Sequence, residues 1–370
     1  MRLPFFFIIV LAAIALLVDF YILRDIKKYI SERHRKSWRI GCYISMIIGY
    51  GLLIGVFCIP VRSESSDILP VMWLLYSFLS IYIPKIIYVL FSLAGKGISW
   101  IVRKIRRFTI GRGRNYGAVI GVVVAVATFF SLWWGVFFTR REIEVNRVEI
   151  TSAKLPAAFN GYKIVQFSDV HVGTWGEDTT FVSSLVDRIN SLHPDVIVFT
   201  GDIVNRRTDE LRPFLKTLSR LKAKDGVYSV LGNHDYGDYI DWKNEADHKK
   251  NNELLARWER EMGWKLLNNQ RDFIVRGNDS IVMLGVENWG EPPFPEYGRI
   301  KDAYPVSRDS AYNLNDSRFK VLLTHNPEHW NREVTQISNI DLSLSGHTHA
   351  MQMMVKIGGW KWSPSVIKYP

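Results

Sequence analysis

The stretch "LSLSGHTHAMQMM" (residues 342–354) places two histidines, His347 and His349, directly after a short apolar segment and Gly346. Short apolar segments bounded by glycine and polar residues are typical of β-strands. Imidazole is also a common metal ligand, so the stretch indicates a strand that ends at a metal site. Two imidazoles are too few for such a site, and the remaining donors must come from other parts of the chain.

Four other segments have the same form, an apolar run that ends in polar residues. They are "YKIVQFSDVHVG" (162–173) with Asp169 and His171, "DVIVFTGDIV" (195–204) with Asp202, "GVYSVLGNHDYG" (226–237) with Asn233, His234 and Asp235, and "FKVLLTHNPEHW" (319–330) with His325.

The segments between the first three runs have apolar residues at helical spacing, at 178–194 and 209–221. Alternation of strands and helices predicts a sheet with parallel strands, whose carboxyl ends lie at one edge and bind ligands there. Further along, 242–263 predicts a charged helix, 271–289 a hairpin that turns at "RGNDS", and the proline-rich 291–298 a loop. Five strand ends can therefore converge on one site.

The polar strand ends supply two carboxylates, one amide and four imidazoles, without a thiolate. This set suits Mn²⁺, Fe or Zn²⁺ better than Ca²⁺ or Cu(I). Seven donors fit two ions that share a carboxylate, and such a pair of ions can hold a phosphoryl oxygen and supply a bridging hydroxide as nucleophile. We expect His234 to act as a general acid or charge partner for the substrate, and Asp235 to orient His234.

Each motif taken alone has a structural explanation. An aspartate after Gly201 is a common helix cap, and a lone histidine such as His325 is more often a buried structural residue. His193, His248 and His329 lie outside the pattern, and we expect no role for them at the site. The joint occurrence of all five strand ends favours the metal site.

The order D-x-H, G-D, G-N-H-D, H and G-H-x-H resembles the calcineurin-like metallophosphoesterase superfamily, over residues 160–355 and in its bacterial membrane-anchored subgroup. The resemblance implies a four-layer α/β/β/α sandwich. It also implies a binuclear site in which Asp202 bridges the ions and His234 is catalytic. The implied ligands are Asp169, His171, Asp202 and His349 for one ion, and Asp202, Asn233, His325 and His347 for the other.

The sequence departs from the family pattern in three places. Asn205 stands where a further acid often follows the bridging aspartate, and Ala350-Met351-Gln352 replaces a common Gly-Gly-Gln. The chain also ends at Pro370, 21 residues after His349. We therefore expect the catalytic domain, residues 161–370, to lack its last strands.

The first 138 residues predict a membrane anchor. Apolar segments at about 4–23, 40–60, 69–95 and 117–138 are each near the ~20 residues that cross a bilayer as a helix. A cleaved signal peptide is a weaker explanation for the first, because only Arg2 precedes it and no small-residue cleavage site follows. We expect a linker at 139–160 between the anchor and the catalytic domain.

Charge predicts the topology of this integral membrane protein in a bacterial inner or plasma membrane. The loops at 24–39 and 96–114 each carry seven Lys or Arg, whereas 61–68 carries one. The positive-inside rule puts the two basic loops in the cytoplasm and everything after residue 138 on the extracytoplasmic face. Asp19 and Lys85 lie inside spans, and we favour side chains that reach the inner interface over an ion pair between helices.

These observations predict a membrane-anchored phosphoesterase that hydrolyses a phosphomonoester, phosphodiester or pyrophosphate, including lipid-linked ones. The alternative is a catalytically silent membrane receptor or scaffold with the same fold, which the complete ligand set disfavours. Residues 1–138 hold 17 Lys and Arg against 5 Asp and Glu, and residues 139–370 hold 30 against 31. Because the second part is nearly neutral, we expect no nucleic-acid partner.

Overall fold

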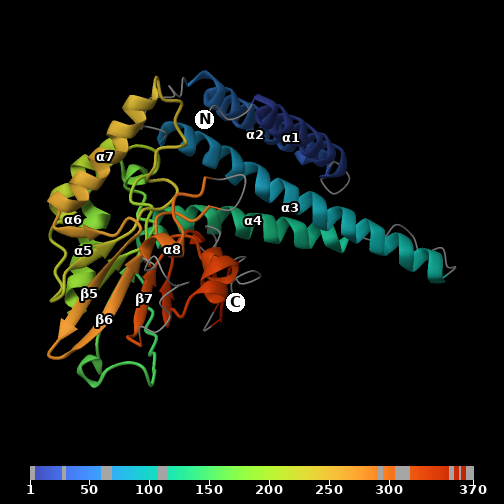
Figure 1. The fold of residues 1–370 in the computed structure, drawn as a ribbon. Helices are drawn as coiled ribbons and strands as arrows, with labels where there is room; N and C mark the ends of the chain where they lie inside the picture. Colours follow the sequence, from blue (N-terminus) through green and yellow to red (C-terminus); the bar gives the residue numbers. More distant parts are fainter. Residues whose placement is uncertain are drawn as a thin grey trace. The chain divides into compact units, whose positions relative to one another are not determined.

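The computed structural model describes residues 5–26, 31–59, 69–106, 115–290, 295–304, 317–349, 354–357 and 360–363 (Figure 1). The chain divides into two compact units, Met1–Glu142 and Ile143–Pro370. Part of the expected loop at 291–298, and residues 350–353 of the altered last motif, lie outside the described residues.

The N-terminal unit consists of four helices: α1 (Phe5–Ile26), α2 (Glu32–Cys58), α3 (Leu69–Arg106) and α4 (Tyr116–Phe137). All four are long and apolar enough to cross a membrane. The basic segments that we treated as loops are partly helical, because α2 begins at Glu32 and α3 continues to Arg106. Lys and Arg are good helix formers, so positive charge did not end either helix.

Two ion pairs join α1 to α3. Lys85 Nζ lies 2.7 Å from Asp19 Oδ1, and Lys96 Nζ lies 2.7 Å from Asp25 Oδ1. Tyr82 also donates a hydrogen bond to Asp19, whose side chain is buried. The interpretation that we favoured for Asp19 and Lys85 is therefore wrong: they form an interhelical ion pair, in which each charge has an opposite charge as its partner.

Two four-stranded sheets form the centre of the C-terminal unit. The first has the order β1 (Ile164–Phe167), β2 (Val196–Phe199), β3 (Val227–Ser229) and β4 (Trp264–Leu266), all parallel. The second has the order β5 (Gln270–Arg276), β6 (Asp279–Gly285), β7 (Lys320–Leu323) and β8 (Leu342–Leu344). In it β5 and β6 form the expected antiparallel hairpin, and β6, β7 and β8 are parallel. A short antiparallel pair, β9 (Val355–Ile357) and β10 (Trp360–Trp362), follows.

Helices α5 (Thr180–Ser191) and α7 (Glu245–Glu261) match the predicted helices at 178–194 and 242–263. The segment predicted as a helix at 209–221 is instead mostly a 3-10 helix, η4 (Thr208–Phe214), followed by the single turn α6 (Leu215–Leu218). Pro213 explains the difference, since proline has no N–H to donate within a helix. The remaining elements are η1 (Thr139–Arg141), η2 (Ala157–Phe159), η3 (Val172–Trp175), α8 (Ile300–Ala303), the π-helical η5 (Trp330–Val334) and α9 (Thr335–Ile337).

Three hydrophobic cores separate four layers. On β2, Ile197 and Phe199 pack with the residues of α5, α6 and α7, while Val196 and Val198 pack with the second sheet. The other face of the second sheet packs against α8 and η5. The alternation along one strand thus produces the helix, sheet, sheet, helix sandwich that the family resemblance implies. Phe159, which we assigned to the linker, is buried in the core between the sheets.

Candidate metal centre

The predicted donors lie at the carboxyl ends of five strands. Asp169 and His171 follow β1, Asp202 follows β2, Asn233 follows β3, His325 follows β7, and the 347–349 pair follows β8. In the first sheet the register pairs Phe167 with Phe199 and Phe199 with Ser229, so these three strands end close together. The sheet therefore brings loops that are distant in sequence to one edge.

Several of these donors have a left-handed backbone, which is uncommon for residues other than glycine. Their φ angles are 56° for Asp169, 44° for His171, 63° for Asp202, 76° for His347 and 48° for His349. Strained backbone of this kind is concentrated at functional sites, where the surrounding structure maintains it. It also explains how His347 and His349, two residues apart, point in different directions.

The first donor group contains Asp169, His171, Asp202 and His349, with one ligand atom of each within 4.8 Å of all the others. His349 Nε2 lies 3.1 Å from Asp169 Oδ1 and 3.1 Å from His171 Nε2. His171 Nε2 lies 3.5 Å from Asp202 Oδ2. Two imidazole nitrogens and two carboxylate oxygens thus surround a common point.

The second donor group contains Asp202, His325 and His347. His325 Nε2 lies 3.2 Å from Asp202 Oδ2 and 3.2 Å from His347 Nδ1. Asn233 Oδ1 joins this group, at 3.1 Å from His325 Nε2 and 3.0 Å from His347 Nδ1. All seven predicted donors therefore belong to one of two groups, and only Asp202 belongs to both.

The hydrogen bonds of two histidines leave lone pairs that suit a metal. His171 donates from Nδ1 to Val204 O, and His325 donates from Nδ1 to Thr200 O. Each ring therefore presents an unprotonated Nε2 toward Asp202 when it is neutral. Convergent nitrogen and carboxylate lone pairs repel one another unless a cation or proton lies among them, so these donors fit two divalent ions.

Electrostatics keep Asp202 ionised although it is buried. Burial alone would raise its pKa, but the neighbouring histidines, His325 first, lower it well below the usual range. The same proximity acts on His325: burial lowers its pKa, and the Asp202 carboxylate reverses this and raises it to about 9. A side chain at Gly232 would approach Asp202 Oδ1 to 2.2 Å, so this position accommodates only glycine.

Asp235 differs from the expectation that it orients His234. The carboxylate of Asp235 is fully buried and accepts hydrogen bonds from the backbone N–H groups of residues 202, 203, 204 and 232. The His234 ring instead donates from Nδ1 to Asn205 O at 2.6 Å. Asp235 thus holds the loop that carries Asp202, because four N–H groups converge on it.

The sequence did not single out Tyr239, which lies against two site residues. Its hydroxyl accepts a hydrogen bond of 2.7 Å from Asn233 Nδ2, and its ring stacks on His234. No motif spacing marks this position; the only signal was an aromatic residue shortly after "GNHD". Glu210 was also missed: it accepts hydrogen bonds from the backbone N–H groups of Asn205, Arg206 and Arg207.

The histidines outside the pattern lie outside both donor groups. His329 is buried, with Nδ1 at 2.9 Å from Thr324 Oγ1 and Nε2 at 2.7 Å from Glu333. His248 Nε2 donates to Tyr236 O. Both ring nitrogens of His329 are thus engaged, and it is structural, as expected.

Comparison with known families agrees with this geometry. The family model described as "Calcineurin-like phosphoesterase" matches residues 162–351. The chain belongs to the calcineurin-like phosphoesterase family. A second model, described as "Probable Calcineurin-like phosphoesterase, transmembrane domain", matches residues 1–140, so this family member is an integral membrane protein.

Three relatives of this calcineurin-like phosphoesterase illustrate its range. A transmembrane protein with metallophosphoesterase domain from Danio rerio is 30% identical over 239 residues, which cover 63% of the chain and 50% of the relative. An uncharacterized metallophosphoesterase from Helicobacter pylori strain J99 is 28% identical over 265 residues, which cover 71% of the chain and 64% of the relative. The UDP-2,3-diacylglucosamine pyrophosphatase LpxG of Chlamydia trachomatis is 36% identical over 128 residues, which cover 33% of the chain and 38% of the relative. The chain thus spans between half and two thirds of the length of the first two.

Proposed function

We propose that this protein is a membrane-anchored phosphoesterase that depends on two divalent metal ions. The observation that carries the proposal is the sharing of Asp202 between two donor groups, the second of which Asn233 joins through its amide oxygen. One ion would be held by Asp169, His171, Asp202 and His349. The other would be held by Asp202, Asn233, His325 and His347, and Mn²⁺, Fe or Zn²⁺ suits the mixed oxygen and nitrogen donors.

The bound ions would supply charge that stabilises a phosphoryl group and lowers the pKa of water. The protein's own contribution begins with His234, whose ring lies 4.8 Å, centroid to centroid, from that of His171. Because Nδ1 is committed to Asn205 O, Nε2 is the atom that exchanges a proton with the substrate. In its protonated form Nε2 would donate to the leaving oxygen of the ester. Asp235 acts indirectly, by holding the loop of Asp202.

The substrate class that we favour is a phosphomonoester, phosphodiester or pyrophosphate carried by a lipid. Attachment to a bilayer raises the local concentration of membrane-borne substrates. The name of the Chlamydia trachomatis relative, a UDP-2,3-diacylglucosamine pyrophosphatase, supports a lipid-linked pyrophosphate. We therefore place lipid pyrophosphates first among the substrates to be tested.

Substitution of the shared carboxylate tests the proposal. Asp202→Asn should abolish metal-dependent hydrolysis of an aryl phosphodiester and reduce the metal content of the folded protein. His234→Ala should slow hydrolysis by about 10²–10⁴-fold and leave the metal content unchanged. Activity in Asp202→Asn equal to that of the wild type would disprove the two-metal site. Metal bound by the wild type without turnover of any phosphomonoester, phosphodiester or lipid pyrophosphate would favour a silent receptor.

We also propose that the C-terminal unit lies on the extracytoplasmic face, as the charge distribution of the anchor predicts. Protease added outside intact spheroplasts should release the domain from about residue 139 onward. Complete protection, with release only after lysis, would place the domain in the cytoplasm.

A further inference from the structure

The length of α2 exceeds what a bilayer requires. Its 27 residues extend over about 40 Å, whereas the hydrocarbon core is about 30 Å thick. The apolar part from Ile40 to Cys58 extends over about 28 Å and would fill that core. When α2 spans the membrane, Glu32 to Arg39 therefore lie at the level of the lipid head groups.

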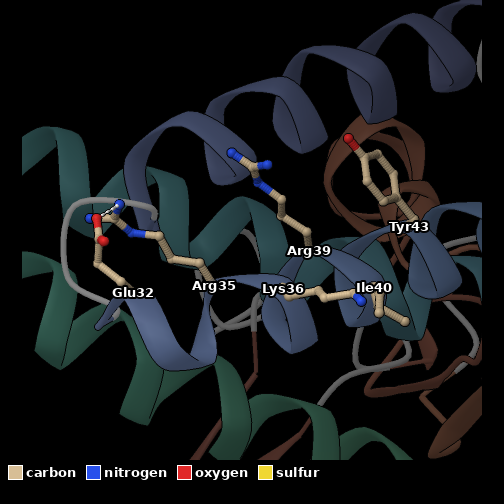
Figure 2. Close-up of a pocket in the computed structure, with 6 residues that line it drawn as sticks. All are labelled: Glu32, Arg35, Lys36, Arg39, Ile40 and Tyr43. Atoms are coloured by element: carbon tan, nitrogen blue, oxygen red, sulfur yellow. Dashed lines mark hydrogen bonds and ion pairs between the residues drawn. The ribbon is translucent and has the colours of Figure 1, made fainter.

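A pocket of about 460 Å³ lies at this level of the helix, and Figure 2 shows its lining residues. They are Glu32, Arg35, Lys36, Arg39, Ile40 and Tyr43. All six come from the first turns of α2, at the spacing that places side chains along one side of a helix. The lining residues named thus form one face of α2.

The charges of the pocket are unbalanced. It contains three cations and one acid, and that acid, Glu32, pairs with Arg35. Within the described parts of the chain, Lys36 and Arg39 have no ion pair with an acidic side chain. Both side chains are exposed, so the pocket presents two uncompensated positive charges to a ligand.

Apolar side chains continue from the pocket along α2. Ile40 and Tyr43 form its inner end and are about half exposed, and Ile44 and Ile47 follow with 52% and 71% of their surface exposed. The polar tip and apolar ring of a tyrosine suit the boundary between head groups and acyl chains. Along α2 the basic side chains are thus followed, within about two turns, by apolar side chains. A phospholipid has the matching order, with its phosphate at the membrane surface and its acyl chain below.

We propose that the pocket on α2 binds the phosphate of an acidic phospholipid, with the acyl chain along Ile40, Tyr43 and Ile47. Guanidinium and ammonium groups are the usual donors to phosphate oxygens, and basic residues beside membrane helices attract acidic head groups. The apolar continuation distinguishes a lipid from free phosphate, which would not use it. Its residues are different from those of the metal centre, and the proposal does not depend on the proposed hydrolysis.

The test uses the full-length protein in detergent and counts bound lipids by native mass spectrometry. The probes are phosphatidylglycerol, phosphatidylcholine with the same chains, and inorganic phosphate. Arg39→Gln removes one charge from the pocket, and Arg33→Gln is the matched control, since Arg33 lies on the same helix outside the pocket. Circular dichroism confirms that each variant remains helical.

Phosphatidylglycerol should bind the wild type more tightly than phosphatidylcholine does. Arg39→Gln should weaken phosphatidylglycerol binding about fivefold, and Lys36→Gln should have a similar effect. Arg33→Gln should leave it close to the wild type. Equal loss in Arg33→Gln and Arg39→Gln, equal binding of the two lipids, or displacement of phosphatidylglycerol by equimolar inorganic phosphate would each overturn the proposal.

Discussion

The ring of Tyr239 stacks on that of His234, with centroids 4.5 Å apart and planes inclined by 30°. The same side chain accepts a hydrogen bond from Asn233 Nδ2, so one residue contacts both the proposed catalytic histidine and a proposed metal ligand. Because the amide nitrogen of Asn233 is committed to Tyr239, its oxygen is the atom directed toward His325 and His347.

We predict that two substitutions at Tyr239 separate these contacts. Tyr239→Phe keeps the ring and loses the hydroxyl, and should weaken binding of the second metal ion by about tenfold or more. Tyr239→Leu also loses the stacked ring, and should in addition lower kcat in metal-saturated protein. Isothermal titration of the metal and steady-state kinetics measure the two effects. If Tyr239→Phe and Tyr239→Leu had the same metal affinity and the same kcat, the hydroxyl and the ring of Tyr239 would not have separate roles.

A second prediction distinguishes two buried histidines that follow β7. His325→Ala should remove at least one metal ion per chain, because its Nε2 faces Asp202 and Asn233. His329→Ala should keep the metal content, because its ring nitrogens lie against Thr324 and Glu333. It should instead destabilise the domain by about 1–3 kcal/mol, since the buried hydroxyl of Thr324 and the partly buried carboxylate of Glu333 lose a partner. Metal analysis and thermal unfolding on both variants check this, and metal loss from His329→Ala would contradict it.

A third prediction concerns Glu259 on α7, a buried carboxyl group that accepts a hydrogen bond from Ser229. Burial raises its pKa to about 8, against an ordinary value of 4.5. Between these two pH values the folded state binds more protons than the unfolded state. The free energy of unfolding should therefore fall as pH rises from about 4.5 to about 8, by a few kcal/mol from this group.

The variant Glu259→Gln should flatten this pH dependence, because an amide resembles the protonated acid and does not ionise. Glu253→Gln is the control, since Glu253 lies on the same helix with its side chain exposed. Thermal unfolding of the full-length protein at several pH values measures both. A wild-type slope that survives in Glu259→Gln would show that other groups cause it.

A fourth prediction concerns the anchor. Asp19→Asn leaves Lys85 charged without its partner inside the bundle and should destabilise the anchor by about 3–5 kcal/mol. The double variant Asp19→Asn with Lys85→Met removes both charges and should be less destabilised than the single variant. Thermal unfolding in detergent compares them with the single variant Lys85→Met, and a double-variant loss equal to the sum of the two single losses would indicate that the pair contributes nothing.

The sequence predicted which strand ends bring donor side chains together, and it did so for a physical reason. Parallel strands bring their carboxyl ends together, so residues as distant as Asp169 and His349 can be assigned to one site from their positions after apolar runs. The hairpin of β5 and β6 was equally accessible, because alternation and a Gly-Asn turn are local signals.

Other features depended on contacts that no local pattern encodes. Asp235 was expected to touch its neighbour His234, but it faces the backbone of a loop 33 residues earlier. Tyr239 contacts the site because the chain folds back after the motif. The pairing of Asp19 with Lys85 required the register of two helices, which hydropathy does not supply.

The left-handed backbone of five proposed ligands affects which substitutions these positions can accept. At such positions glycine is less strained than aspartate or histidine, and large substitutions are disfavoured. A copy of this gene released from selection for hydrolysis would therefore gain stability by exchanging ligands such as His171 or His347 for glycine. Aspartate and histidine at these positions therefore cost stability that the fold alone does not require.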